Sequence, residues 1–180
     1  MDVCKDLSSI AISKKLPVSI PQEYLLLTLH RPENVDNPQN LRLLMNHIAS
    51  TNHPVVFPVH PRTKKNLQLF NINVPSNITM IEPLGYMDFL SLMSKSKLIL
   101  TDSGGIQEES ITIKKPCITL RHTSARWETI LLKANILFPP DREGNLDEVI
   151  KTMLSTTINR NPYGENVAQN ILEILQSELK

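Results

Sequence analysis

The sequence predicts an α/β fold: a three-layer, Rossmann-like open parallel sheet of about six strands. Short, almost wholly apolar runs alternate along the chain with segments of helical spacing. Strands that alternate with helices form βαβ units with right-handed crossovers, and both faces of the resulting sheet are covered. The length of 180 residues and the hydrophobic fraction of 41% suit one such domain with a sizeable core.

The predicted strands are apolar runs separated by predicted helices. They are YLLLTL (24–29), PVVFPV (54–59), ITMI (78–81), KLILT (97–101), PCITL (116–120) and NILF (135–138). Three helical faces stand out: Leu41, Leu44, Met45 and Ile48; Phe89, Leu90 and Met93; and Val149, Ile150, Met153 and Leu154. Asn37 is a good N-cap for the first of these helices, with Pro38 at its first helical position.

Composition excludes several classes of function. The net charge is +1, and no basic run interleaved with aromatic residues predicts nucleic-acid binding. No apolar run is long enough to span a bilayer, and MDVCKDLSS lacks the apolar core of a signal peptide. Cys4 and Cys117 are too few for a disulfide framework, and Cys117 is predicted to be a reduced core residue. We therefore expect a cytoplasmic protein that binds neither membranes nor nucleic acid.

The stretch ILTDSGGIQEES (99–110) holds two of the five glycines side by side. KLILT is a predicted strand and IQEESITI begins a helix, so Ser103, Gly104 and Gly105 form a turn at the ligand-binding edge of the sheet. Paired glycines allow positive φ and close approach of an anion, and the first amides of the helix are unpaired. This pattern predicts a phosphate or diphosphate site. The alternative is that Ser103 caps the helix and the glycines make a tight turn.

Other polar residues follow the predicted strands and reach the same rim of the sheet. They are His30, Arg31, His60, Asp102, Arg121, His122 and Arg126. An arginine fork can hold a phosphate, and a histidine can hold or transfer a proton near neutral pH. Any one of these residues, taken singly, fits a structural histidine or a solvated arginine. Their joint placement by the topology is what predicts a site.

Six motifs in order resemble the C-terminal half of the non-hydrolysing UDP-N-acetylglucosamine 2-epimerases, which have the glycosyltransferase-B architecture. The motifs are LTLHRPENVDN, FPVHPRT, EPLGYMDFLSLM, ILTDSGGIQEES, KKPCITLRHTSARWET and NPYGEN. The resemblance runs along nearly the whole chain. It implies that the fold is equivalent to one half of a glycosyltransferase-B fold and that UDP or a UDP-N-acetylhexosamine is the ligand.

The resemblance also implies roles for individual residues. The turn of Ser103, Gly104 and Gly105 would bind the diphosphate, and Glu109 would bind the ribose hydroxyls. Arg31, His60 and Arg126 would be UDP-binding, and His30 matches the catalytic histidine of the family. The reaction implied interconverts UDP-GlcNAc and UDP-ManNAc: a carboxylate removes the C2 proton, UDP leaves C1, and the glycal is reprotonated on the other face before UDP returns. No cofactor and no metal are expected.

Full-length members of the family are roughly twice as long, with two Rossmann-like domains around a cleft. The catalytic carboxylates lie mainly on the other half, and none is carried over to this sequence. We therefore expect the nucleotide-binding half of an epimerase, not competent alone. The alternatives are a non-catalytic UDP-sugar-binding or regulatory module, the donor half of a glycosyltransferase, or a metal site from His30, His60 and His122. No close ligand pair such as HxxxH supports the metal site.

The predicted domain is 1–180, with an inter-domain helix in 1–16 and a C-terminal helix in 163–180. The family loop TERPE reads SARWE at 124–128, and the end motif NPYGDG reads NPYGEN at 161–166. Two apolar stripes have helical spacing: Val3, Leu7 and Ile10; and Val167, Ile171, Leu175 and Leu179. Part of the C-terminal stripe would lack a partner, which predicts a homo-oligomer or docking onto a separate N-terminal-half polypeptide.

Overall fold

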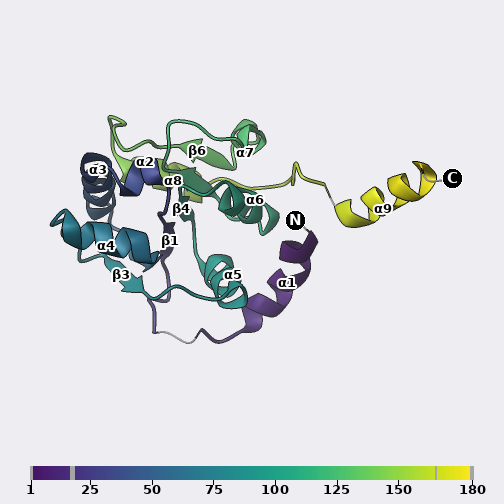
Figure 1. The fold of residues 1–180 in the computed structure, drawn as a ribbon, viewed down its shortest axis with the longest axis horizontal. Helices are drawn as coiled ribbons and strands as arrows, with labels where there is room; N and C mark the ends of the chain where they lie inside the picture. The colour runs from purple at the N-terminus through teal and green to yellow at the C-terminus, as the bar shows by residue number, and fades with distance from the viewer. Residues whose placement is uncertain (1, 17–18, 165, 179–180) are drawn as a thin grey trace.

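The computed structural model describes residues 2–16, 19–164 and 166–178, and it contains an all-parallel six-stranded sheet in the order β3-β2-β1-β4-β5-β6 (Figure 1). The strands are β1 Leu25–Thr28, β2 Val55–Pro58, β3 Ile78–Ile81, β4 Ile99–Thr101, β5 Cys117–Thr119 and β6 Asn135–Leu137. Each lies inside or matches a predicted apolar run, so the predicted α/β class is confirmed.

Helices connect and flank the strands. They are α1 Asp2–Ser13, α2 Pro32–Val35, α3 Pro38–Ala49, α4 Pro61–Leu69, α5 Tyr86–Lys95, α6 Gly104–Thr112, α7 Trp127–Leu131, α8 Leu146–Leu154 and α9 Val167–Glu178. The predicted cap is confirmed, because the Asn37 side chain accepts hydrogen bonds from the amides of Gln39 and Asn40 and Pro38 opens α3. The helical spacing had not identified α2, α4 or α7.

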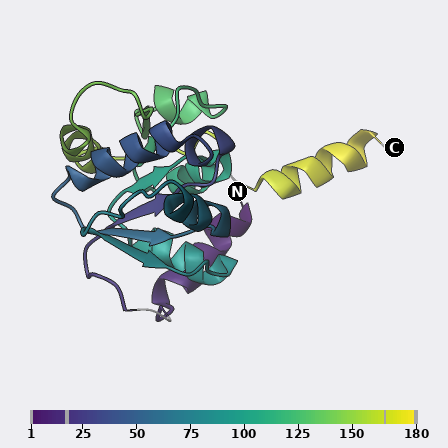
Figure 2. The same ribbon diagram turned by 60° about the vertical axis from the view of Figure 1, so that its left-hand side comes forward.

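Buried apolar side chains form two separate cores, and alternate positions of β1, β2 and β4 contribute to opposite cores. Helices cover both faces of the sheet (Figure 2). On one face, Leu25 and Leu27 pack into a cluster with apolar residues of α3, α4 and α8. On the other face, Leu26 packs with residues of α1 and α5, and Ile106 of α6 packs against that cluster. Burial on both faces explains why the strands are nearly continuous apolar runs.

The order of the strands reverses between β1 and β4. Strand β1 pairs with β2 on one side and with β4 on the other, with Leu26 opposite Ile99 and Thr28 opposite Thr101. The following connections then diverge to opposite faces of the sheet. A crevice forms beyond the carboxyl ends of the strands at such a switch point, which is where open α/β sheets bind ligands. His30 and Ser103 lie just beyond these two strand ends.

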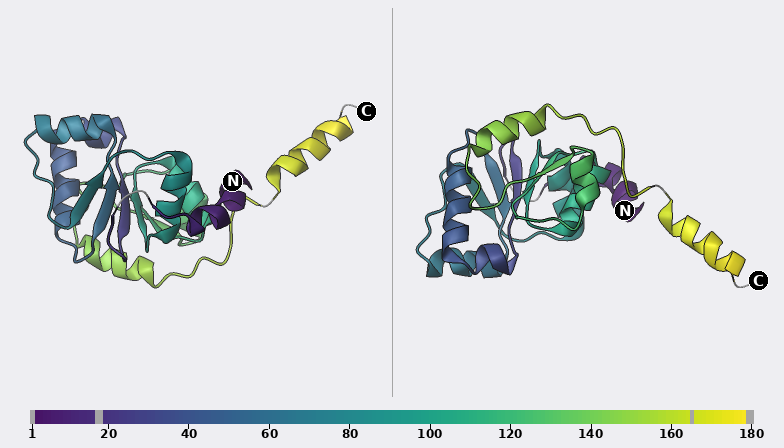
Figure 3. Two further views of the ribbon diagram at one scale, coloured as in Figure 1. Left: turned by 90° about the horizontal axis from the view of Figure 1, so that it is seen from below. Right: turned by 90° about the horizontal axis from the view of Figure 1, so that it is seen from above.

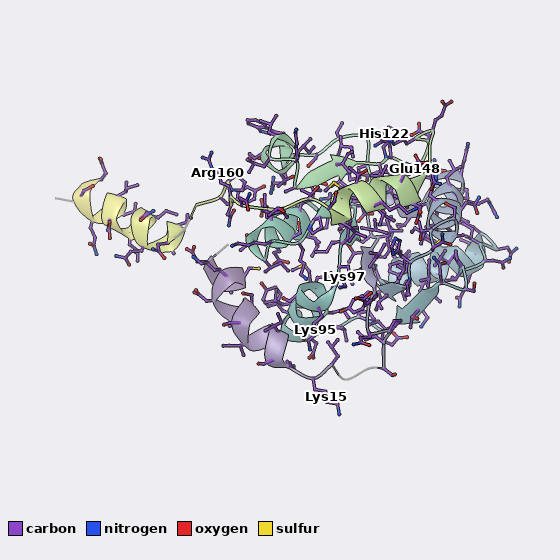
Figure 4. All side chains as sticks on the ribbon, turned by 180° about the vertical axis from the view of Figure 1, so that it is seen from behind. Lys15, Lys95, Lys97, His122, Glu148 and Arg160 are labelled. Carbon is purple, nitrogen blue, oxygen red and sulfur yellow. The ribbon has the colours of Figure 1, made fainter. Side chains whose placement is uncertain are left out.

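The two terminal helices differ in their contacts. Helix α1 packs along α5, and Cys4 and Ala11 of α1 are buried. Helix α9 extends away from the sheet and its covering helices, and none of its residues is buried (Figures 1 and 3). The connection from α8 to α9 carries Arg160 and runs along the back of the molecule (Figure 4). Leu179 of the predicted stripe and Glu165 of the end motif lie outside the described residues.

Among the described residues, no helix has the length and apolar character needed to cross a bilayer.

Candidate functional site

A cavity of about 250 Å³ opens at the switch point. Residues at the ends of β1 and β2, before and within α5, and at the start of α6 line this cavity. They are Thr28, Leu29, His30, Pro58, His60, Pro83, Leu84, Phe89, Ser103 and Ile106. Leu84, Phe89 and Ile106 supply an apolar wall. His30, His60 and Ser103 supply polar groups. An apolar wall with a few convergent polar groups is typical of a small-molecule site.

Asp102, directly after β4, organises the polar side of this cavity. Its carboxylate has no exposed surface and accepts the backbone amides of His30 at 3.0 Å and Arg31 at 2.9 Å. It also accepts the side-chain amide of Asn34 at 3.3 Å, and its Oδ1 lies 3.2 Å from Nδ1 of His30. A buried carboxylate is stable only when donors surround it. Asp102 therefore fixes the segment after β1 against the end of β4.

Ser103, Gly104 and Gly105 open α6 beside the cavity. The Ser103 side chain caps the helix by accepting from the amide of Ile106 at 3.5 Å, so the capping alternative is correct as far as it goes. The expectation of positive φ at this turn was wrong, because the positive-φ glycines are Gly144 and Gly164. Gly104 and Gly105 instead take up the first helical positions.

The space in front of the two glycines is open. A Cβ on Gly104 would meet nothing within 4 Å, and one on Gly105 would only touch Oγ of Ser103 at 4.0 Å. Packing within the chain therefore does not require glycine here. The free amides of the first turn, at the positive end of the helix dipole, remain accessible to an anion without a side chain in the way.

His60 lies beyond the end of β2 and is the N-cap of α4. Its Nδ1 accepts the backbone amide of Arg62 at 3.2 Å, so the imidazole caps the helix. Arg31 contributes its backbone to Asp102, while its Nε is buried and has no hydrogen-bond partner in the described part of the chain. A buried guanidinium nitrogen without a partner is costly unless a ligand or water satisfies it.

Glu109 lies outside the cavity lining, on α6 facing α1 and α5. Its Oε1 accepts a hydrogen bond from the Tyr86 hydroxyl at 3.3 Å. Burial raises the pKa of the Glu109 carboxyl, and the neighbouring Glu108 raises it further. Burial, together with the charge of Glu109, also raises the pKa of the Cys4 thiol to about 11. In this structure Glu109 therefore belongs to a partly buried polar cluster between three helices.

Arg126 also lies outside the cavity lining. Its Nε forms an ion pair with Glu108 that lacks the alignment of a hydrogen bond. Its backbone is held at both ends, because its amide donates to Oγ of Ser124 at 2.9 Å and its carbonyl accepts from the Thr129 hydroxyl at 2.7 Å. Gln107, buried in α6, accepts from the Ser124 hydroxyl and so ties the arginine loop to the helix.

The remaining charged residues of the predicted rim have partners elsewhere. Arg121 pairs with Glu33 at 2.9 Å, and His122 pairs with Asp141 at 2.7 Å, both away from the cavity lining. No group of three or more histidine, cysteine, aspartate or glutamate side chains is placed to hold a metal ion within the described ranges.

The structure therefore brings His30, His60 and Ser103 around one cavity, with Gly104, Gly105 and Arg31 immediately adjoining. Sequence reasoning placed Asp102 on the rim but missed its role as the centre of the hydrogen bonds there. It also missed the apolar wall around Phe89. The amphipathic helix signal had identified Phe89 only as a core residue.

The strand order 3-2-1-4-5-6, a switch-point crevice and a helix that starts with two glycines define a Rossmann-type α/β domain, a class in which this crevice typically binds phosphate groups or nucleotides. A family model described as UDP-N-acetylglucosamine 2-epimerase matches residues 2–176. This chain belongs to the UDP-N-acetylglucosamine 2-epimerase family.

Relatives agree with this assignment. The chain is 44% identical over 168 residues to a UDP-N-acetylglucosamine 2-epimerase of Methanocaldococcus jannaschii, covering 88% of this chain and 46% of that protein. It is 41% identical to one of Methanococcus maripaludis, covering 99% of this chain and 49% of that protein. The chain thus spans about half the length of the curated relatives it matches.

A solved epimerase structure also matches nearly the whole of this chain with about half of its own length. A crystal structure of the Methanocaldococcus jannaschii UDP-GlcNAc 2-epimerase in complex with UDP-GlcNAc and UDP superposes with a TM-score of 0.84 at 36% identity, over 98% of this chain and 52% of that one. A calicheamicin glycosyltransferase, at 18% identity and a TM-score of 0.54, shares the fold alone. The fold is one half of a glycosyltransferase-B architecture.

Proposed function

We propose that this chain binds UDP or a UDP-N-acetylhexosamine at the switch-point cavity and serves as the nucleotide half of a UDP-N-acetylglucosamine 2-epimerase. The observation that carries the proposal is the start of α6. There Gly104 and Gly105 take the first helical positions with open space in front of them, beside a cavity that Ser103, His30 and His60 line. Relatives and solved structures named as UDP-GlcNAc 2-epimerases support the choice of ligand.

In this proposal the diphosphate lies at the amides of Gly104 and Gly105, within reach of His60. Arg31 offers an unpaired Nε to the same anion. The apolar wall of Leu84, Phe89 and Ile106 fits the planar base, because an aromatic ring and aliphatic groups can pack on both its face and its edge.

Glu109 and Arg126 take part only after their present contacts are exchanged. For Glu109 to accept hydrogen bonds from ribose hydroxyls, its contact with Tyr86 must open. For Arg126 to bind a phosphate oxygen, the diphosphate must replace Glu108 as the partner of its guanidinium. A doubly charged group competes well for an arginine already held near the site.

Epimerisation at C2 needs a base for the C2 proton. In the expected scheme the C2–H bond breaks as the C1–O bond to UDP breaks, and UDP adds back after reprotonation on the opposite face. No carboxylate lines the cavity among the described residues, and Asp102 is buried with all its donors in place. We therefore propose that the chain alone binds the nucleotide without turnover, and that its cationic and amide groups stabilise the departing diphosphate.

The missing base must come from a second polypeptide chain or domain. Helix α9 exposes Val167, Ile171, Leu172, Ile174 and Leu175. We propose that a polypeptide equivalent to the N-terminal half of the relatives, or a second copy of this chain, covers this helix.

The proposal is tested by calorimetry with UDP and by NMR of UDP-GlcNAc in D₂O. We expect UDP to bind, uridine to bind much more weakly, and a chelator to change neither result. We expect no deuterium at C2 with the chain alone and exchange once the N-terminal half of a relative is added. Deuterium incorporation by the chain alone would show that it carries its own base, and absence of UDP binding would overturn the proposal.

A further inference from the structure

We propose that the two histidines of the cavity are held in opposite neutral tautomers, with Asp102 as the positioning residue for His30. His30 then presents a lone pair at Nε2, whereas His60 presents an N–H at Nε2. The inference rests on the proposed function in one respect only: that a ligand faces both rings. The tautomers themselves follow from contacts within the chain.

The case for His30 begins with the carboxylate of Asp102. The backbone amide of His30 is shared between Oδ2 at 3.0 Å and Oδ1 at 3.2 Å, and Oδ2 also accepts the amide of Arg31 and the side-chain amide of Asn34. Oδ1 therefore has fewer donors and is the oxygen that faces the imidazole. Nδ1 of His30 lies 3.2 Å from that oxygen. The contact is not aligned as a hydrogen bond, but an ionised carboxylate presents only lone pairs. A lone pair on Nδ1 would face that oxygen repulsively, so the contact favours the proton on Nδ1.

The position of Asp102 cannot adjust easily. Its carboxylate has no exposed surface, and its neighbour Thr101 is bonded through its hydroxyl to Thr28 at 2.6 Å. The amide of Ser103 in turn donates to the Thr101 hydroxyl at 3.0 Å. A carboxylate fixed in this way can impose both the ring orientation and the tautomer of its histidine, as in other Asp–His pairs.

The contacts of His60 favour the opposite tautomer. Its Nδ1 accepts the backbone amide of Arg62 at 3.2 Å. A backbone amide only donates, so Nδ1 must hold the lone pair, and the proton of the neutral ring lies on Nε2. The backbone amide of Arg62 at the start of α4 therefore fixes the tautomer of His60 as a donor to Nδ1. Asp102 fixes the tautomer of His30 as an acceptor facing Nδ1.

The two tautomers give the two imidazoles different roles toward a ligand. A neutral His60 already donates from Nε2, which suits a phosphate oxygen. His30 presents its lone pair at Nε2, which suits acceptance of a proton or a hydrogen bond from the ligand. The structure thus separates proton acceptance from phosphate contact, which the residue types alone leave open.

Long-range ¹H–¹⁵N NMR of histidine-labelled protein, without ligand and at alkaline pH, measures these tautomers directly. His30→Gln and His60→Gln variants assign the two rings. We expect mainly Nδ1–H for His30 and mainly Nε2–H for His60. In Asp102→Asn, the new side-chain amide can face Nδ1 as a donor, so we expect His30 to change to Nε2–H while His60 stays unchanged.

Asp141→Asn is the matched control, because Asp141 contacts His122 in an exposed pair on the rim away from the cavity. It should alter neither cavity histidine. A wild-type His30 that is mainly Nε2–H, or a folded Asp102→Asn protein in which His30 keeps Nδ1–H, would overturn the proposal. If Asp102→Asn does not fold, the wild-type spectrum still decides. A separate titration with UDP tests the proposed function, because failure to bind would leave the tautomers as they are.

Discussion

At the junction of β1 and β4, one carboxylate without exposed surface holds two backbone amides, a side-chain amide and an imidazole, whereas α9 buries no residue along its length. In the first region the carboxylate of Asp102 has all its partners within the chain. The second leaves apolar side chains in water. The contrast teaches that the edge at β1 and β4 is fixed by contacts within the chain, while α9 has no such contacts for its apolar side chains and is the part of the fold on which the proposed partner would act.

The largest change in the free energy of unfolding should come from removing the Asp102 carboxylate. Asp102→Ala leaves the buried amides of His30 and Arg31 without their acceptor and removes one of the two acceptors of the Asn34 side chain. We expect a loss of about 3–5 kcal/mol in the free energy of unfolding, measured in urea. Asp141→Ala, which removes an exposed histidine partner, should cost less than about 0.5 kcal/mol. Equal losses for the two variants would remove the distinction between buried and exposed pairs.

A substitution at the start of α6 should have a smaller effect, raising the stability of the free protein and lowering its affinity for UDP. Gly105 has helical backbone and room for a Cβ, so Gly105→Ala should raise the stability of the free protein by about 0.5–1 kcal/mol. The same methyl group would crowd a bound diphosphate, so UDP affinity should fall by about tenfold, or roughly 1.4 kcal/mol. Thermal melting and calorimetry measure the two quantities. Unchanged affinity would mean that the diphosphate lies elsewhere. Cys117→Ser is a control for affinity, since Cys117 is buried in β5.

Glu109, which lies between α1, α5 and α6, should make the free energy of unfolding depend on pH. Burial raises the pKa of its carboxyl in the folded protein above the ordinary value of 4.5, so the folded state holds this proton more tightly than the unfolded chain does. The resulting stability is present below pH 4.5 and is lost as the pH rises through the raised pKa. Glu109→Gln should flatten this decline in urea unfolding curves recorded across that range. An unaltered slope would place the titration on another group.

The sequence was informative where burial decides the structure. Apolar runs located all six strands, because a strand covered on both faces has no polar positions to obscure it. Helix α4 was missed because it buries only Thr63, Asn66 and Leu67, which leaves no apolar periodicity to read.

The site was harder to predict because side-chain direction depends on distant segments. Glu109 and Arg126 were expected at the ligand, yet Tyr86 and Glu108 hold them elsewhere in the free protein. Asp102 acts on residues about seventy positions earlier in the chain, which no local motif reveals. The paired glycines were located correctly, but only one of the two reasons given for them was wrong: their backbone needs no positive φ, whereas the space in front of the helix start is indeed open.

The smallest effect on stability, and the most informative one about partners, is expected in α9. Ile171 and Leu175 are 51% and 53% exposed, so Ile171→Ser with Leu175→Ser should change the unfolding free energy of the chain by less than about 0.5 kcal/mol. The same double variant should lose association with an N-terminal-half polypeptide, or with a second copy, in light scattering.

Asn170→Ser, on the same helix but outside the apolar stripe, should keep that association. A 12-residue helix with no buried side chain is marginal in water by itself, so circular dichroism should also show α9 gaining helix when the partner is added. Destabilisation of the isolated chain by more than about 2 kcal/mol would instead mean that α9 packs against its own sheet, because only buried apolar side chains carry so large a cost.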